Sequence, residues 1–87
     1  MNIIAQIRKC IENEYCQITI NIFSHHDIIF KIYEKEVPIA VDPITEEIFF
    51  DAELYNGKLY AIEIEELSKI VAVIKENIEE IKTWVKD

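Results

Sequence analysis

The apolar residues of this chain change their spacing twice, and that change limits the folds that the chain can adopt. Up to residue 14 they recur every three or four positions, which is helical spacing. From residue 15 they alternate with polar residues, as in a strand with one buried face, and after residue 64 the helical spacing returns. With 87 residues, these segments have to share one core. The sequence therefore predicts a single compact α+β domain over residues 1–87.

Two alternating segments separated by a polar run predict the first hairpin of an antiparallel sheet. In residues 15–23 apolar side chains occupy every second position, and in residues 28–36 Ile28, Phe30 and Ile32 share one face, which gives each strand one apolar face. The run between them, from Ser24 to Asp27, consists of residues that favour turns. Antiparallel pairing through that turn is the simplest connection between two such strands.

A second hairpin is predicted over residues 48–54 and 58–64. A three-residue loop, Tyr55 to Gly57, keeps the apolar side chains of both strands on the same face. It also places Gly57 at the loop position that requires a left-handed backbone conformation. The two hairpins together predict about four strands.

Two prolines bracket a short apolar piece between the hairpins. Pro38 and Pro43 flank residues 39–41, which could form a further strand. Because proline has no N–H to donate to a neighbouring strand, we expect this piece to be short or to lie at an edge of the sheet.

Helical spacing flanks these strands on both sides. Residues 3–14 predict a helix that Asn2 could cap, and residues 65–85 predict a long C-terminal helix whose apolar residues are four, three, four, three and four positions apart. This stripe would also allow a coiled-coil dimer, but packing on the chain's own sheet is favoured because that sheet otherwise lacks a cover. We expect both helices on one face, in the order α-β-β-(β)-β-β-α.

The charge balance excludes several classes of function. Nine basic and 17 acidic residues give a net charge of −8, which argues against direct binding of nucleic acid or of an anionic membrane. A single glycine, Gly57, excludes a glycine-rich phosphate loop. The apolar stretches are too short for a membrane span or a signal peptide. We therefore expect a cytoplasmic location, or the host cytoplasm if the protein is encoded by a phage.

Nearly all of the net charge lies in one segment. Residues 39–66 contain one lysine and eight acidic residues, a net charge of −7. The candidate partner-binding residues, which we call the acidic set, are Asp42, Glu46, Glu47, Asp51, Glu53, Glu63, Glu65 and Glu66. Such a set can attract a basic partner over a distance. The alternative is a solvated face that only maintains solubility.

A catalytic or metal site would have to be built from Cys10, Cys16, His25 and His26. Cys10 lies on the apolar face of the first predicted helix, and Cys16 is in register with the isoleucines of the first strand. Both are therefore expected to be buried thiols rather than a disulfide or a nucleophile. Neighbouring side chains of an extended segment point to opposite faces, so His25 and His26 fit a turn better than a metal site. No catalytic residue, metal or cofactor is predicted.

These observations favour a small non-catalytic binding protein. We expect an inhibitor or regulator that docks its acidic surface onto a basic, nucleic-acid-binding surface of a larger protein, for example a phage-encoded anti-defence inhibitor of the anti-CRISPR type. The first alternative is an antitoxin, an immunity protein or a subunit with an apolar and possibly homodimeric interface, formed through Trp84 or outward tyrosines. The second alternative is a metal- or thiol-dependent enzyme that uses His25, His26 and a cysteine.

Overall fold

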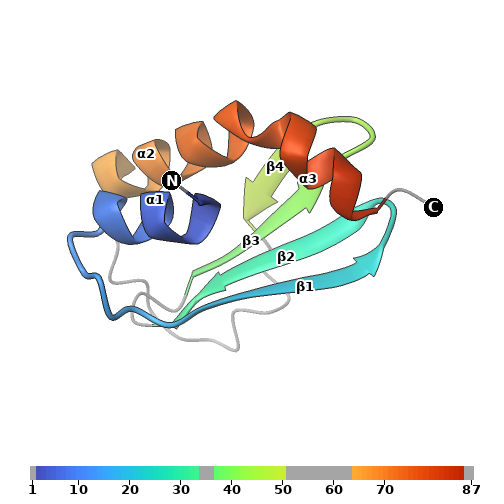
Figure 1. Ribbon diagram of the computed structural model, residues 1–87. Helices are drawn as coiled ribbons and strands as arrows, with labels where there is room; N and C mark the ends of the chain where they lie inside the picture. Colours follow the sequence, from blue (N-terminus) through green and yellow to red (C-terminus); the bar gives the residue numbers. More distant parts are fainter. Residues whose placement is uncertain (1, 34–36, 51–63, 86–87) are drawn as a thin grey trace.

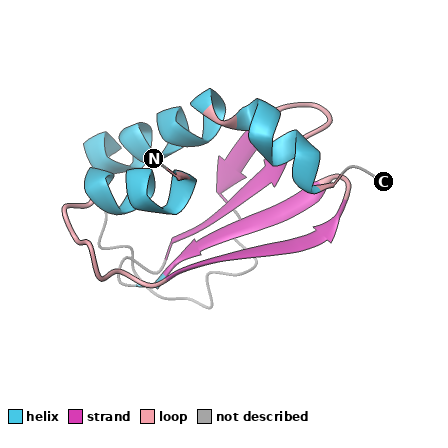
Figure 2. Cartoon of the chain, viewed as in Figure 1, coloured by secondary structure: helices cyan, strands magenta, loops and turns pink. Residues whose placement is uncertain are grey.

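Three helices cover one face of a four-stranded antiparallel sheet in the computed structural model, which describes residues 2–33, 37–50 and 64–85 (Figure 1). Figure 2 shows the same two layers by secondary structure. The sheet order follows the chain, β1-β2-β3-β4. This is the α+β class predicted from the sequence. The elements are α1 (Ile3–Cys10), β1 (Ile18–Ser24), β2 (Asp27–Ile32), β3 (Val37–Asp42), β4 (Glu47–Phe50), α2 (Ile64–Glu76) and α3 (Ile78–Trp84).

The first helix begins where the sequence predicts and ends earlier. Asn2 caps it, since its side-chain oxygen accepts a hydrogen bond of 2.8 Å from the N–H of Ala5. The helix ends at Cys10, not at residue 14. Glu12 has a φ of 52°, a left-handed conformation that cannot continue a right-handed helix.

The first predicted hairpin is present as β1 and β2, in a register that pairs Ile20 with Phe30. Both strands are shorter than predicted, because β1 begins at Ile18 and β2 ends at Ile32. Pairing continues one step further through the N–H of Tyr33, which donates to the carbonyl of Gln17 at 3.0 Å.

The further strand that the sequence allows over residues 39–41 is present, but it lies inside the sheet and not at an edge. β3 pairs with β2 on one side and with β4 on the other. The two prolines do not prevent this, because Pro38 is the second residue of β3 and Pro43 follows its last. Residues 39–42 between them all have an N–H group to donate.

The described part of the second predicted hairpin pairs with β3. Ile48 lies opposite Val41 and not opposite Ile64, as the predicted register has it. Residues 51–63, which hold the rest of the predicted pairing and the loop from Tyr55 to Gly57, lie outside the described residues. Ile64 is not the end of a strand but the first residue of α2. Glu65 and Glu66 follow it, and acidic side chains in the first turn favour helix formation through the helix dipole.

The predicted C-terminal helix is interrupted at Asn77, which lies between α2 and α3. The side-chain NH2 of Asn77 donates to the carbonyl of Val73 at 2.7 Å and to the side-chain oxygen of Gln6 in α1 at 3.1 Å. Asparagine side chains that bond to nearby backbone compete with helical geometry, and the φ of −105° at Asn77 departs from it. The same bonds tie the break to α1.

The inner face of the sheet and the apolar sides of the helices form one core. The C-terminal helical stripe packs on the chain's own sheet, and Trp84 lies with its ring centroid 6.1 Å from that of Phe30 in β2. Part of the Trp84 side chain therefore packs against the chain's own core. The buried residues of this cluster are Ile3, Ile7, Cys16, Ile18, Ile28, Phe30, Ile32, Ile39, Val41, Ile70, Ile74 and Ile81.

Candidate functional site

The structure places the described members of the acidic set in two separate groups. Asp42, Glu46 and Glu47 lie in and beside the turn between β3 and β4, and Glu65 and Glu66 lie in the first turn of α2. In Figure 1 the β3–β4 turn is near the junction of α2 and α3, whereas α2 begins at the opposite end of the molecule. The three remaining members, Asp51, Glu53 and Glu63, lie outside the described residues.

Asp42 holds the β3–β4 turn together. Its carboxylate accepts hydrogen bonds from the N–H of Ile44 at 2.9 Å and the N–H of Thr45 at 3.2 Å. The same carboxylate lies 3.1 Å from Nδ1 of His26, in the turn between β1 and β2. Only 16% of the Asp42 side chain is exposed. Asp42 thus links the two turns at this end of the sheet, and it has little carboxylate surface to offer a partner.

The hydrogen bonds to Asp42 change its pKa. Burial of the carboxylate raises the pKa, but the bonds from Thr45, His26 and Ile44 together outweigh burial and hold the pKa of Asp42 below its ordinary value. A carboxyl with a lowered pKa in the folded state binds its proton more readily in the unfolded state. Its contribution to stability is therefore complete above its ordinary pKa, and is lost as the pH falls through the lowered value.

We expect Asp42→Asn to reduce stability at pH 7 and to make it less sensitive to acid below about pH 4, the ordinary range of a carboxyl. Urea unfolding measured between pH 2 and pH 7, which spans about that range, tests this. Glu47→Gln, an exposed residue beside the same turn, is the matched control. An unchanged pH profile for Asp42→Asn would contradict the structural role assigned to this carboxylate.

Glu46 has a cationic partner from another element. Nζ of Lys82, in α3, lies 3.6 Å from Oε2 of Glu46 and 3.3 Å from Oε1 of Glu79. The hydrogen bond to Glu79 is the main cause of the raised pKa of Lys82, and the charge of Glu46 adds to it. One lysine of α3 therefore partly neutralises two carboxylates. Glu47 and Glu65 are exposed at the surface, and Glu66 is half-buried.

The histidines and cysteines lie at different places in the fold. His25 and His26 form the exposed turn between β1 and β2, where the hydroxyl of Ser24 accepts a bond from the N–H of His26. Cys16 precedes β1, so the seven residues of that strand separate it from His25 by more than about 20 Å. The structure therefore does not bring Cys16 and His25 together for nucleophilic catalysis.

Both thiols are free. Cys16 is buried, and Cys10 is half-buried on α1, where burial raises its pKa despite the nearby charge of Lys69. A raised pKa leaves less of the reactive thiolate at neutral pH. Across residues 2–33, 37–50 and 64–85, no group of three or more His, Cys, Asp or Glu side chains is placed to hold a metal ion.

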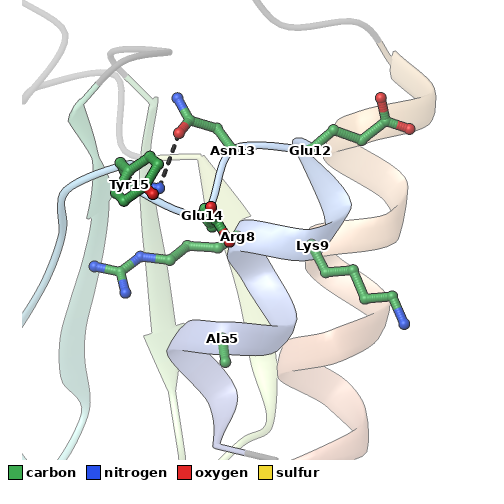
Figure 3. Close-up of a pocket in the computed structure, with 7 residues that line it drawn as sticks. All are labelled: Ala5, Arg8, Lys9, Glu12, Asn13, Glu14 and Tyr15. Atoms are coloured by element: carbon green, nitrogen blue, oxygen red, sulfur yellow. Dashed lines mark hydrogen bonds between the residues drawn. The ribbon is translucent and has the colours of Figure 1, made fainter.

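A hollow of about 850 Å³ that sequence reasoning did not identify lies at the end of α1 (Figure 3). It is lined by side chains of both signs, among them Arg8, Lys9, Glu12 and Glu14. Nε of Arg8 donates to the carbonyl of Cys16 at 2.8 Å, and Figure 3 shows Lys9 pointing away from Arg8. The two cations therefore do not converge on one point of this hollow.

No protein-family model, curated protein or solved structure matches this chain. None of the helices that the structure describes combines the length and the apolar character needed to cross a membrane. Function therefore has to be inferred from the chain's own charge and geometry.

Proposed function

We propose that this protein is a small non-catalytic binding protein that docks an acidic surface onto a basic, nucleic-acid-binding surface of a larger protein. The observation that carries this proposal is the charge distribution: residues 39–66 have a net charge of −7 within a chain of −8. A phage-encoded inhibitor of the anti-CRISPR type is the concrete example. A field of one sign accelerates the approach of an oppositely charged partner and favours its correct orientation.

The geometry narrows the surface that would contact the partner. Asp42 and Glu46 already have partners within the chain, so they contribute less than their formal charge. Glu47 and Glu65 are exposed and remain candidates from the described residues. Because these two residues lie at opposite ends of the molecule, one compact contact would use either Glu47 or Glu65, together with Asp51, Glu53 and Glu63.

We also propose that the protein acts in the cytoplasm, in the host cytoplasm if it is encoded by a phage. Two free thiols, Cys10 and Cys16, are consistent with a reducing compartment, where unpaired cysteines are the rule.

Reversing the charge of Asp51, Glu53 and Glu63 to lysine is expected to weaken partner binding about tenfold. Wild-type protein immobilised on a resin should retain basic, nucleic-acid-binding proteins from a bacterial lysate at low salt and release them at high salt, because exposed charges are screened. The variant should retain about tenfold less of the same proteins, which corresponds to about 1.4 kcal/mol of binding free energy. Mass spectrometry of the bound fraction is the measurement.

The control has the same change in net charge at other positions. Glu12, Glu14 and Glu80 are exposed residues outside the acidic set, and their replacement by lysine should leave binding within about twofold of the wild type. If the first variant binds as the wild type does, at low and at high salt, the acidic-surface proposal is wrong. Equal losses in both variants would show that only net charge matters.

A further inference from the structure

β1 forms one edge of the described sheet, and its register shows which backbone groups face outward. Gln17 accepts a hydrogen bond from Tyr33, so these two residues form a hydrogen-bonded pair. In an antiparallel ladder such pairs alternate with pairs that do not bond to each other. Ile18, Ile20 and Ile22 therefore direct their N–H and C=O groups away from β2.

Within the described part of the chain, this edge lacks the protection that edge strands usually have. Charged side chains are the commonest protection, yet β1 contains none, whereas β2, β3 and β4 each contain at least one. Two apolar residues of β1 are also exposed: Ile22 by 50% and Phe23 by 66%. The irregular register between Ile22 and Ser24 affects only the last residues of the strand.

The residues before the strand are protected differently. Nε of Arg8 donates to the carbonyl of Cys16 at 2.8 Å. By the same alternation, this carbonyl is the next outward-facing group along the edge. Arg8 thus satisfies the edge beside α1, and among the described residues the outward groups of β1 itself are the part without such protection.

We propose that β1 pairs antiparallel with β1 of a second copy of this chain, around a two-fold axis at Ile20. This register places Ile20 opposite its counterpart and Ile18 opposite Ile22 of the second copy, so the isoleucines of both strands share the inner face. Thr19 then lies opposite Asn21 of the second copy, which leaves polar residues on the outer face. The result is one continuous sheet across both copies, closed because each copy uses its single β1 edge.

The absence of charged residues on β1 favours a second copy as the occupant over a basic partner. Two molecules of net charge −8 repel each other, and they can approach most closely where neither presents a charge. β1 is such a surface, and it has no carboxylate to recognise lysine or arginine. This interface is independent of the acidic set, whose described members lie on β3, β4, the turn between them and α2.

Amide hydrogen exchange, measured by NMR on the full chain, tests the pairing at single residues. The N–H groups of Thr19 and Asn21 bond to β2 and should be protected at every concentration. Those of Ile20 and Ile22 should exchange quickly in dilute protein and become protected between about 10 μM and about 1 mM, where interfaces of modest size associate. Rapid exchange of Ile20 and Ile22 at all concentrations overturns the proposal.

Two matched variants test the same interface by sedimentation velocity. Ile22→Lys puts like charges near the axis and should raise the dimer dissociation constant by at least about tenfold. Ile44→Lys makes the same change at an isoleucine of similar exposure, 58%, and should stay within about twofold of the wild type. Circular dichroism verifies that both variants fold.

Each other result excludes the proposal. If the wild type stays monomeric throughout the concentration range, pairing between two copies is wrong. The β1 edge would then be a candidate for pairing with a strand of a different protein. Species larger than a dimer would exclude closed two-fold pairing. If Ile22→Lys does not fold, the exchange rates of Ile20 and Ile22 in the wild type still decide the question.

Discussion

Replacing Phe30 with alanine is expected to unfold the protein or to leave it barely stable. Phe30 is fully buried in β2, between β1 and β3, and it packs against Trp84 of α3. Removing a buried phenylalanine side chain costs about 3–5 kcal/mol. A domain of this length has a free energy of unfolding of about 4–13 kcal/mol. The loss is therefore comparable to the lower end of the total stability.

Urea unfolding followed by the fluorescence of Trp84, the single tryptophan, measures this loss. The matched control is Phe49→Ala, because Phe49 is 54% exposed on β4. We expect that change to cost less than about 1 kcal/mol, as is usual for surface positions. Equal losses for the two variants would contradict the core described above.

The second large effect is expected for Ile74→Ala in α2. Ile74 is fully buried against the sheet, and truncation of a buried isoleucine to alanine costs about 2–5 kcal/mol. At about 4–8 °C of melting temperature for each kcal/mol, the variant should melt at least about 8 °C lower than the wild type. Differential scanning calorimetry is the measurement.

The same helix provides the control for Ile74. Ile64, its first residue, is 83% exposed, and Ile64→Ala should change the free energy of unfolding by no more than about 0.5 kcal/mol. This pair of variants separates burial from helix propensity, since both replace isoleucine by the better helix former in one helix. A larger effect at Ile64 than at Ile74 would contradict the burial of Ile74 in the core.

The sequence was sufficient to predict the secondary-structure types and the buried face of the first hairpin. Alternation reports which side of a strand is apolar, so the spacing alone places Ile18, Phe30 and Ile32 on the inner face. Alternation does not report which strands are neighbours. For that reason β3 was expected to be short or at an edge, although its prolines leave a four-residue stretch that can pair on both sides.

Two helix boundaries depend on features of the folded chain that the spacing of apolar residues cannot reveal. The break at Asn77 involves a bond to Gln6, which is 71 positions away in the sequence. The end of α1 depends on the left-handed backbone of Glu12, a residue type without a strong preference for that conformation. Apolar spacing alone therefore predicts a first helix that is too long and a C-terminal helix without the break at Asn77.

The charge of the acidic set could likewise be predicted from the sequence only in part. Counting charges along the chain located the excess in residues 39–66, but could not show which carboxylates find partners. His26 reaches Asp42 across 16 positions, and Lys82 reaches Glu46 from α3. Both contacts require the turns and the helices to be in place, so only the folded chain separates the occupied carboxylates from the exposed Glu47 and Glu65.

The order of the sheet has a consequence for how the chain folds during synthesis. Each strand pairs with the next one along the chain. The strands β1 to β4 can therefore pair one after another while translation continues. The helices α2 and α3, which cover these strands together with α1, are synthesised after all four of them. Until those helices leave the ribosome, the apolar surface that includes Phe30, Ile39 and Val41 lacks the part of its cover that α2 and α3 supply, and exposed surface of this kind favours aggregation.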